Sequence, residues 1–307
     1  MILPPSTPRF LALLYLLPVI PLLGPLPEKL KSSPSAHGVL LDRHGKELTH
    51  FPRQDYFRNK PASLKEIPDH LIKATLAAED KRFFDHPGID YLASARALYK
   101  NTRKNRVTSG ASTITQQLIK ISTPQKKRTP SKKLSEIMLA RRLETRWSKD
   151  QILTAYLNRL DYGSHRQGCA EAARYFFKKP LTDLSLAEAA LLAALPQAPS
   201  RLNPRRNPQA ALERRNWILD RLAFEFDYPS SQIEIAKSEP LQLATLRAKN
   251  PIPHLSNRFS EGAQLSIDSD LQRKTHDILG EELSKLDQKN VQHGAIVVIE
   301  NTTGEIL

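Results

Sequence analysis

Residues 79–88 of this 307-residue chain, EDKRFFDHPG, carry the first side chains that could do chemistry. Glu79 ends an apolar run with helical spacing and stands close to Phe83 and Phe84. A carboxylate that such neighbours partly shield from water is a better general base. An ordinary helix end with solvated charges would give the same pattern, so this segment alone leaves both interpretations open.

A second group lies in residues 110–120, GASTITQQLIK, where hydroxyl and amide side chains gather at a predicted junction between a loop and a helix. The free backbone N–H groups at a helix N-terminus add further donors. Such a junction can bind a phosphate or a sugar. A Ser/Thr N-cap followed by surface glutamines is an equally good interpretation.

The third group is basic and ends in one carboxylate. Its members are Lys120, Lys126, Lys127, Arg128, Lys132, Lys133 and then Glu136. Lys132, Lys133 and Glu136 fall within about one helical turn, so their side chains can converge on one face. A carboxylate among cations stays ionised and could position a cation or a divalent metal. A solvated helix face with ion pairs fits the same run.

Helical spacing predicts that the body positioning these groups, from about residue 65 to 226, is mainly α. Two capping boxes support this prediction, Ser148 with Gln151 and Ser185 with Glu188, because each satisfies the free N–H groups that begin a helix. The pattern of apolar residues after each box has the helical period. The three candidate groups therefore lie on helices or at helix ends.

The flanking segments have other patterns. Alternation over residues 39–51 predicts a hairpin, and residues 271–286 predict an amphipathic helix. Residues 101–110 are polar and basic without apolar period, which predicts a mobile loop. Residues 294–307, GAIVVIENTTGEIL, predict a buried strand, a turn at 301–304 and the start of a second strand, as expected where a β-containing domain begins.

Charge and hydropathy restrict the environment. The chain has 46 basic and 32 acidic residues, a net charge of +14, which favours a polyanion or an anionic membrane. A single cysteine excludes an intramolecular disulfide scaffold. Residues 10–26 carry no charge and approach the length of a spanning helix. We expect an uncleaved membrane anchor with a short inner tail; a cleaved signal peptide is the alternative.

Taken together, the groups resemble the motifs of the peptidoglycan glycosyltransferase (transglycosylase) domain of class A penicillin-binding proteins, most like the 1C branch. The EDxxFxxHxG motif matches at Glu79, Asp80, Phe83, His86 and Gly88. The GxSTxTQQ motif matches at Gly110, Ser112, Thr113, Thr115, Gln116 and Gln117. The later motifs match at Lys133, Glu136, Ile152, Leu153, Tyr156, Leu157, Asn158, Gly163, Gly168, Arg214 and Arg215. The resemblance covers about residues 40–230.

This resemblance implies a mainly α, lysozyme-like fold beside a membrane and polymerisation of lipid II, a disaccharide-peptide linked to undecaprenyl pyrophosphate. It implies that Glu79 is the general base and that Glu136 assists at the donor sugar. It gives a substrate-binding role to Asp80, Phe83, His86, Ser112, Thr113, Gln116, Gln117, Lys120, Arg128, Lys132, Lys133 and Asn158. No cofactor is obligatory, although a divalent cation such as Mg²⁺ could act beside Glu136.

Some positions depart from the family pattern. Lys132 replaces an arginine, Thr154 replaces a glutamate and Phe177 replaces a glycine, but no catalytic carboxylate is lost. The S-x-x-K, SDN and KTG motifs of the transpeptidase domain are absent, so we do not expect this sequence to act as a transpeptidase.

The resulting domain prediction has four parts. We expect a tail and anchor over 1–27, a stalk and hairpin over 28–64, and the glycosyltransferase domain over 65–230. Residues 231–307 are expected to form a linker and the beginning of an incomplete transpeptidase-type domain.

The predicted partners are lipid II, the growing lipid-linked glycan, an anionic membrane and other wall-synthesis proteins, without nucleic acid. The predicted location is the bacterial inner membrane, with one membrane pass and the catalytic domain on the outer side. A lysozyme-like glycan hydrolase and a non-enzymatic wall-synthesis scaffold are the alternatives. The basic group argues against the hydrolase, and the two carboxylates argue against the scaffold.

Overall fold

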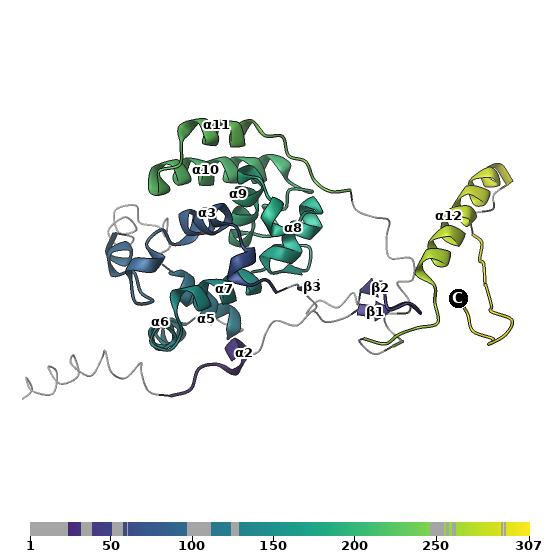
Figure 1. Cartoon of the computed structure of the whole chain (residues 1–307), viewed down its shortest axis with the longest axis horizontal. Coiled ribbons are helices and arrows are strands. Elements are labelled where there is room, and N and C mark those ends of the chain that lie inside the picture. The colour runs from purple at the N-terminus through teal and green to yellow at the C-terminus, as the bar shows by residue number, and fades with distance from the viewer. Residues whose placement is uncertain are drawn as a thin grey trace, which may run out of the picture. The chain divides into compact units, whose positions relative to one another are not determined.

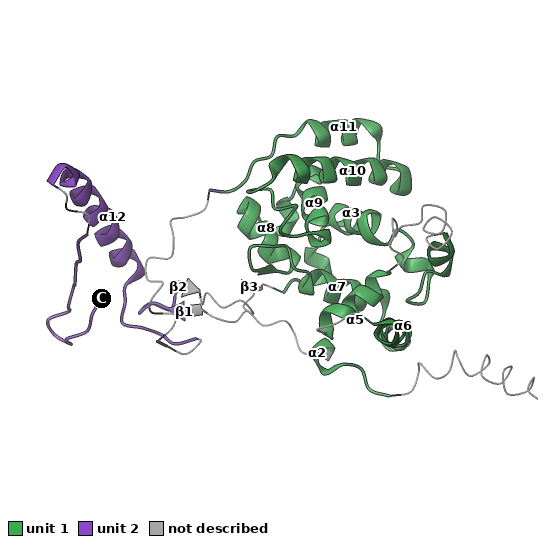
Figure 2. Ribbon diagram, turned by 180° about the vertical axis from the view of Figure 1, so that it is seen from behind, with its two compact units in different colours: residues 1–35, 59–244 green, residues 36–58, 245–307 purple. Residues whose placement is uncertain are grey.

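The computed structural model divides the chain into two compact units (Figure 2). Unit 1 contains Met1–Ser35 and Asn59–Ala244, and unit 2 contains Ala36–Arg58 and Thr245–Leu307. The structure describes residues 24–31, 39–50, 58–59, 61–96, 112–123, 129–245, 255, 258–259, 262–289, 291 and 293–307.

Two predicted segments fall largely or wholly outside these residues. The predicted anchor is described only from residue 24 onward, and the predicted loop at 101–110 is not described at all. Within the described ranges, no helix combines the length and the apolar character needed to cross a membrane.

Unit 1 is helical, which confirms the prediction of a mainly α body. Its α-helices are α2 (Glu28–Lys31), α3 (Asp69–Glu79), α5 (Ile114–Ser122), α6 (Pro130–Glu144), α7 (Lys149–Arg159), α8 (Cys169–Phe177), α9 (Leu186–Ala194), α10 (Pro208–Phe226) and α11 (Ser230–Ser238). Its short 3-10 turns are η2 (Leu64–Glu66), η3 (Phe83–Asp85), η4 (Leu181–Asp183) and η5 (Leu195–Gln197). The two-residue strand β4 (Arg166–Gln167) also belongs to unit 1, whereas β3 (Arg58–Asn59) spans the boundary between the two units.

The helix starts follow the capping chemistry expected from the sequence. The hydroxyls of Ser148 and Ser185 each accept a hydrogen bond from the backbone N–H three residues on. The side chains of Gln151 and Glu188 in turn accept the backbone N–H of Ser148 and Ser185, so both predicted capping boxes are confirmed. These caps satisfy donors that a helix N-terminus would otherwise leave free. They fix the starts of α7 and α9.

Helix α9 lies at the centre of unit 1. It is buried on all sides, as expected for a helix that is apolar around its whole circumference. One face packs with α3 and α10 through small residues such as Ala77, Ala190 and Ala194. Its other face joins a core to which α5, α6, α7 and α8 contribute Leu118, Leu143, Ile152 and Phe176, among others. Figure 1 shows α10 and α11 on one side of α3 and α9, with α5, α6 and α7 on the other.

The segment around α2 contributes to the same core. Leu26 and Leu30 are buried, although they lie in the stretch predicted as anchor and stalk. Arg142 on α6 donates a hydrogen bond to the Pro25 carbonyl at 2.9 Å, and Arg159 on α7 donates one to the Leu30 carbonyl at 3.1 Å. Residues 24–31 are therefore fixed to unit 1 by packing and by these two arginines.

Unit 2 contains the predicted hairpin. Strands β1 (Val39–Leu41) and β2 (Glu47–His50) pair antiparallel, and Leu40 and Leu48 form a small core with Leu255, Ala263, Leu265 and Ile267. The Asp42 carboxylate accepts hydrogen bonds from the backbone of His44 and Lys46 and from the Ser269 hydroxyl. These bonds tie the hairpin turn to the start of α12 (Ser269–Lys285), the amphipathic helix predicted from the sequence. A 3-10 turn, η7 (Asp287–Lys289), follows α12.

The prediction of a buried strand in residues 294–307 is wrong. The turn forms where expected, and Ile299 and Ile306 make an antiparallel bridge. However, Ile296, Val297 and Ile299 are 45%, 68% and 54% exposed. An apolar strand is buried only when another element covers it, and no described element of unit 2 covers this one.

Candidate active site

Glu79 is the last residue of α3, and its carboxylate is half-buried. The C-terminal end of a helix carries partial negative charge, so the helix itself does not stabilise this anion. Gln117 on α5 provides a partner, since its Nε2 donates a hydrogen bond to Glu79 Oε2 at 2.8 Å. The candidate base is thus held by a residue of the second motif, as expected if the motifs form one site.

A positive charge from α10 also acts on Glu79. Burial lowers the pKa of the Arg214 guanidinium, and the Glu79 carboxylate is close enough to oppose part of this effect. The Arg214 Cζ lies 3.8 Å from the centroid of the Trp217 ring, which supports the guanidinium by a cation–π contact. Arg214 therefore contributes a positive charge that interacts with Glu79.

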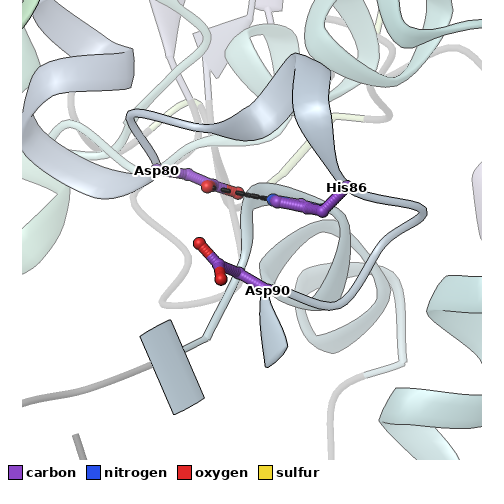
Figure 3. Close-up of side chains that lie close together, drawn as sticks. All are labelled: Asp80, His86 and Asp90. Carbon is purple, nitrogen blue, oxygen red and sulfur yellow. Dashed lines mark hydrogen bonds and ion pairs between the residues drawn. The ribbon is translucent and has the colours of Figure 1, made fainter. Parts of the chain in front are cut away.

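The segment after Glu79 is fixed by a buried brace. Asp80 and His86 point toward each other, with His86 Nε2 at 3.1 Å from both carboxylate oxygens (Figure 3). The Asp80 carboxylate also accepts the backbone N–H of Ile114, at the start of α5, at 3.0 Å. Both side chains are buried, so we interpret Asp80 and His86 as structural residues that join the Glu79 loop to α5, and not as residues that contact substrate.

Asp90 lies beside this brace, and its carboxylate is held by Arg82 and by the backbone N–H of Ala93. Burial alone would raise the pKa of Asp90, but the hydrogen bonds from Arg82 and Ala93 outweigh it and lower the pKa below its usual value. Asp90 therefore stays ionised as the partner of a cation that the protein itself supplies.

These three residues also define the geometry of a possible metal site. Within the described ranges, Asp80, His86 and Asp90 are the group whose candidate ligand atoms lie close enough, all within 4.8 Å of one another. Their ligand atoms are already engaged, by one another, by the Ile114 amide and by the Arg82 guanidinium. A metal would have to displace Arg82, so this group does not fit a cation and we assign no catalytic step to one there.

Phe83 belongs to the interior of the same segment. It is fully buried and meets His86 edge-on, with ring centroids 6.4 Å apart. The Lys149 ammonium lies 4.4 Å from the Phe83 centroid and donates to the His86 carbonyl at 2.6 Å and to Glu144 Oε1 at 2.9 Å. Glu144 also accepts the Thr115 hydroxyl at 2.5 Å. Phe83 is therefore a packing residue that helps to set the loop.

The backbone conformation and close packing at position 88 require the glycine of the first motif. Its φ of +84° is one that residues with a Cβ rarely adopt. A Cβ at this position would lie 2.9 Å from Glu144 Cγ and 3.0 Å from the Ala140 carbonyl oxygen on α6. The loop can approach α6 this closely only because residue 88 has no side chain.

Helix α5 carries two adjacent glutamines that contact different parts of the site. Thr113 is its N-cap: the hydroxyl accepts the Gln116 N–H at 3.2 Å and donates to the Gly88 carbonyl at 2.7 Å. The two successive glutamines then serve different partners. Gln117 bonds Glu79, whereas the Gln116 Oε1 accepts a hydrogen bond from Lys133 Nζ at 3.0 Å.

The Lys133 ammonium donates hydrogen bonds to residues of both the second and the third sequence groups. Besides Gln116, its ammonium donates to Ser112 Oγ at 3.1 Å and to Glu136 Oε2 at 3.0 Å. The Lys133 side chain is 45% exposed and that of Glu136 is 19% exposed. Members of the second and third sequence groups thus form one cluster, which we call the lysine cluster: Ser112, Gln116, Lys133 and Glu136.

The remaining predicted substrate-binding residues have different positions. Lys120 is exposed in the last turn of α5 and Lys132 is half-buried on α6, whereas Arg128 lies outside the described residues. Asn158 is buried, and its amide exchanges two hydrogen bonds of 2.8 Å with the backbone of Ala62. These bonds make Asn158 a brace between α7 and the chain before α3.

Sequence reasoning did not assign a role to three residues that the structure places around the site. Tyr156 contacts Gln117, Lys149 holds the Glu79 loop, and the Arg214 guanidinium interacts electrostatically with the Glu79 carboxylate. Tyr156 and Arg214 were recognised as motif positions, so their place in a motif was the available signal. Lys149 carried no such signal, because its contacts with the Glu79 loop, at Phe83 and the His86 carbonyl, join residues more than 60 positions apart.

Fold and site together define a helical domain in which adjacent residues of one helix contact a carboxylate and a lysine cluster. Comparison with known proteins agrees with this class. The Transglycosylase family model matches residues 44–223, more than half of the chain. The chain therefore belongs to the transglycosylase family, the glycosyltransferase domain of class A penicillin-binding proteins.

Several known proteins are similar to this chain. Penicillin-binding protein 1A of Aquifex aeolicus is 44% identical over 179 residues, which is 58% of this chain and 25% of that protein. Penicillin-binding protein 1C of Escherichia coli is 32% identical over 269 residues, covering 86% of this chain and 34% of that protein. A crystal structure of penicillin-binding protein 1A from Haemophilus influenzae covers 72% of this chain and 23% of its own, with 22% identity and a TM-score of 0.43. The chain thus spans about a quarter to a third of the length of these relatives.

Proposed function

We propose that this chain is a peptidoglycan glycosyltransferase that polymerises lipid II into β-1,4-linked glycan strands. The observation that carries the proposal is that two adjacent residues of α5 contact the two candidate reactive groups. Gln117 donates a hydrogen bond to the candidate base Glu79, and the neighbouring Gln116 accepts one from Lys133 of the lysine cluster. A base and an anion-binding group on adjacent residues of one helix suit a reaction in which a hydroxyl attacks while a pyrophosphate leaves.

The proposed reaction uses these groups as follows. Glu79 takes the proton from the 4-hydroxyl of the acceptor sugar as that oxygen attacks the anomeric carbon of the donor. The new C–O bond forms while the bond from the anomeric carbon to the pyrophosphate oxygen breaks, so the α linkage becomes a β linkage. The proton remains on Glu79, and undecaprenyl pyrophosphate leaves as the anion.

Among the described cations of the basic group, Lys133 is one that the structure joins to the second motif, so we assign it the stabilisation of that leaving anion. Its ammonium is part exposed and is held by three acceptors of the lysine cluster, so its position is fixed before substrate arrives. A preorganised cation lowers the energy of a transition state in which negative charge develops. Glu136 keeps Lys133 in place, and this pairing is the role we propose for the second carboxylate. An Mg²⁺ ion beside Glu136 stays a prediction, and no step depends on it.

The same chemistry favours this function over the two alternatives. A glycan hydrolase has no pyrophosphate to neutralise and would gain nothing from the lysine cluster. A scaffold would gain nothing from an amide held against a carboxylate. We further propose that the chain works at the outer face of a bacterial inner membrane with lipid II, lipid-linked glycan and other wall-synthesis proteins as partners, and without nucleic acid.

The full chain incubated with labelled lipid II tests the proposal. Products are separated by size on a gel and then treated with a muramidase. We expect a ladder of polymer that the muramidase degrades. Unchanged lipid II would contradict the glycosyltransferase function, and cleavage of preformed glycan strands by the chain would favour the hydrolase.

A further inference from the structure

A buried tyrosine lies behind the residue assigned as the base. Tyr156 on α7 has no exposed surface, and its hydroxyl donates a hydrogen bond to Gln117 Oε1 at 3.0 Å. The same Gln117 side chain donates from Nε2 to Glu79 Oε2 at 2.8 Å. Two hydrogen bonds therefore connect the interior of α7 to the carboxylate at the end of α3.

The orientation of the Gln117 amide decides what Glu79 meets. An ionised carboxylate can only accept hydrogen bonds, whereas a glutamine amide has a donating end and an accepting end. If the amide were rotated by half a turn, its oxygen would face the carboxylate and repel it. Tyr156 selects the productive orientation because its O–H needs the amide oxygen as acceptor.

The Tyr156 hydroxyl keeps the proton that it donates to Gln117 Oε1. Burial raises the pKa of this hydroxyl well above the usual value, and the charges of Glu79 and Asp80 raise it further. The phenol therefore keeps its proton at neutral pH. Because this buried O–H needs an acceptor, and Gln117 Oε1 is its acceptor among the described residues, the hydrogen bond favours one orientation of Gln117.

This arrangement also distinguishes the two oxygens of Glu79. Oε2 accepts the bond from Gln117, whereas Oε1 accepts no hydrogen bond from any residue that the structure describes. Oε1 therefore retains the lone pairs that a substrate hydroxyl would need. A free rotation of Gln117 would remove this distinction between the oxygens.

We propose that Tyr156 is a positioning residue that acts through Gln117 to hold Glu79 with Oε2 occupied and Oε1 directed to the acceptor hydroxyl. The proposal rests on the glycosyltransferase function proposed above. It gives Gln117 the task of orienting the base, in place of the substrate-binding role implied by the family resemblance. It also gives Tyr156, one of the later motif positions, a purpose beyond core packing.

Kinetics of three variants of the full chain test the proposal. Tyr156→Phe keeps the buried ring and removes only the donor, so we expect kcat to fall about tenfold while KM changes less than about twofold. Gln117→Met keeps the side-chain length and removes both bonds, with an expected loss of about 10- to 100-fold in kcat. Because Tyr156 acts through Gln117, the double variant should lose no more than Gln117→Met alone. Independent effects would instead multiply.

Tyr162→Phe is the matched control. Tyr162 is also buried but makes no hydrogen bond to Gln117 or Glu79, so its loss should leave kcat unchanged. Multiplying losses in the double variant, or a wild-type kcat for Tyr156→Phe, would overturn the proposal.

A spectroscopic measurement separates this proposal from the proposed function. The side-chain amide protons of Gln117, assigned by their loss in Gln117→Met, should shift in Tyr156→Phe and stay in place in Tyr162→Phe. This readout needs no substrate, so it applies even if the wild-type chain fails to polymerise lipid II. Unchanged amide signals in Tyr156→Phe would show that Tyr156 does not orient Gln117.

Discussion

Replacing Lys133 by methionine tests whether the lysine cluster binds the leaving pyrophosphate. Methionine keeps most of the apolar stem and removes the ammonium, which in the structure contacts Ser112, Gln116 and Glu136. Loss of one charge-assisted contact to phosphate should cost about 1.5–3 kcal/mol in the transition state. This cost corresponds to a fall of roughly 10- to 150-fold in turnover.

The structure also predicts that stability changes little. The Lys133 side chain is 45% exposed, and a pair of this kind contributes at most about 1 kcal/mol. The thermal midpoint of Lys133→Met should therefore stay within a few degrees of the wild type. A large loss of turnover with a small loss of stability is the combination expected of a residue that acts on substrate.

The assay is the rate of lipid II consumption by the full chain under saturating substrate. Lys289→Met is the control, because Lys289 lies in the exposed turn η7 of unit 2. Its turnover should equal that of the wild type. Equal turnover in the Lys133 and Lys289 variants would refute a phosphate-binding role for the lysine cluster.

Three further predictions concern the loop that carries Glu79. Lys149→Met leaves the Glu144 carboxylate, which is 7% exposed, without its cation, and should lower the free energy of unfolding by about 3 kcal/mol in denaturant titrations. Gly88→Ala should lower the thermal midpoint and the activity together, because a Cβ would lie 2.9 Å from Glu144 Cγ. Asp90→Asn should destabilise the chain at neutral pH. The pKa of Asp90 is lowered in the fold, so its contribution is present above the reference value of 3.8 and is lost as pH falls through the folded pKa. The stability difference from the wild type should therefore stay constant from neutral pH down to about pH 5 and disappear in strong acid; a difference that persists there would exclude the ion pair as its cause.

Local patterns in the sequence were sufficient to predict the helices of unit 1. The capping boxes at Ser148 and Ser185 and the helical period after them depend on neighbours within a few residues, so they can be recognised without the fold. The strand predicted in 294–307 failed for the opposite reason. Whether an apolar segment is buried depends on what covers it, and that information is not local.

The candidate site was predictable in its membership but not in its connections. Motifs identify Glu79, Gln117 and Lys133, whereas the pairing of Gln117 with Glu79 joins residues 38 positions apart. Burial separates residues that the motifs treat alike: Phe83 and Asn158 lie in the interior and brace the fold, while Lys133 is part exposed. Only the three-dimensional arrangement shows which motif residues can meet a substrate.

The most direct test of the central claim is lipid II polymerisation by Glu79→Gln beside the wild type. The change keeps the volume and length of the side chain at residue 79 and removes the general base, which contributes about 10² to 10⁴ in rate. Glu213→Gln is the control, since Glu213 is exposed on α10 and bonds only Gln209 among the described residues. We predict that Glu79→Gln makes almost no polymer at unchanged thermal stability and that Glu213→Gln matches the wild type; polymer formed by Glu79→Gln at near wild-type rate would contradict the assignment of Glu79 as the general base.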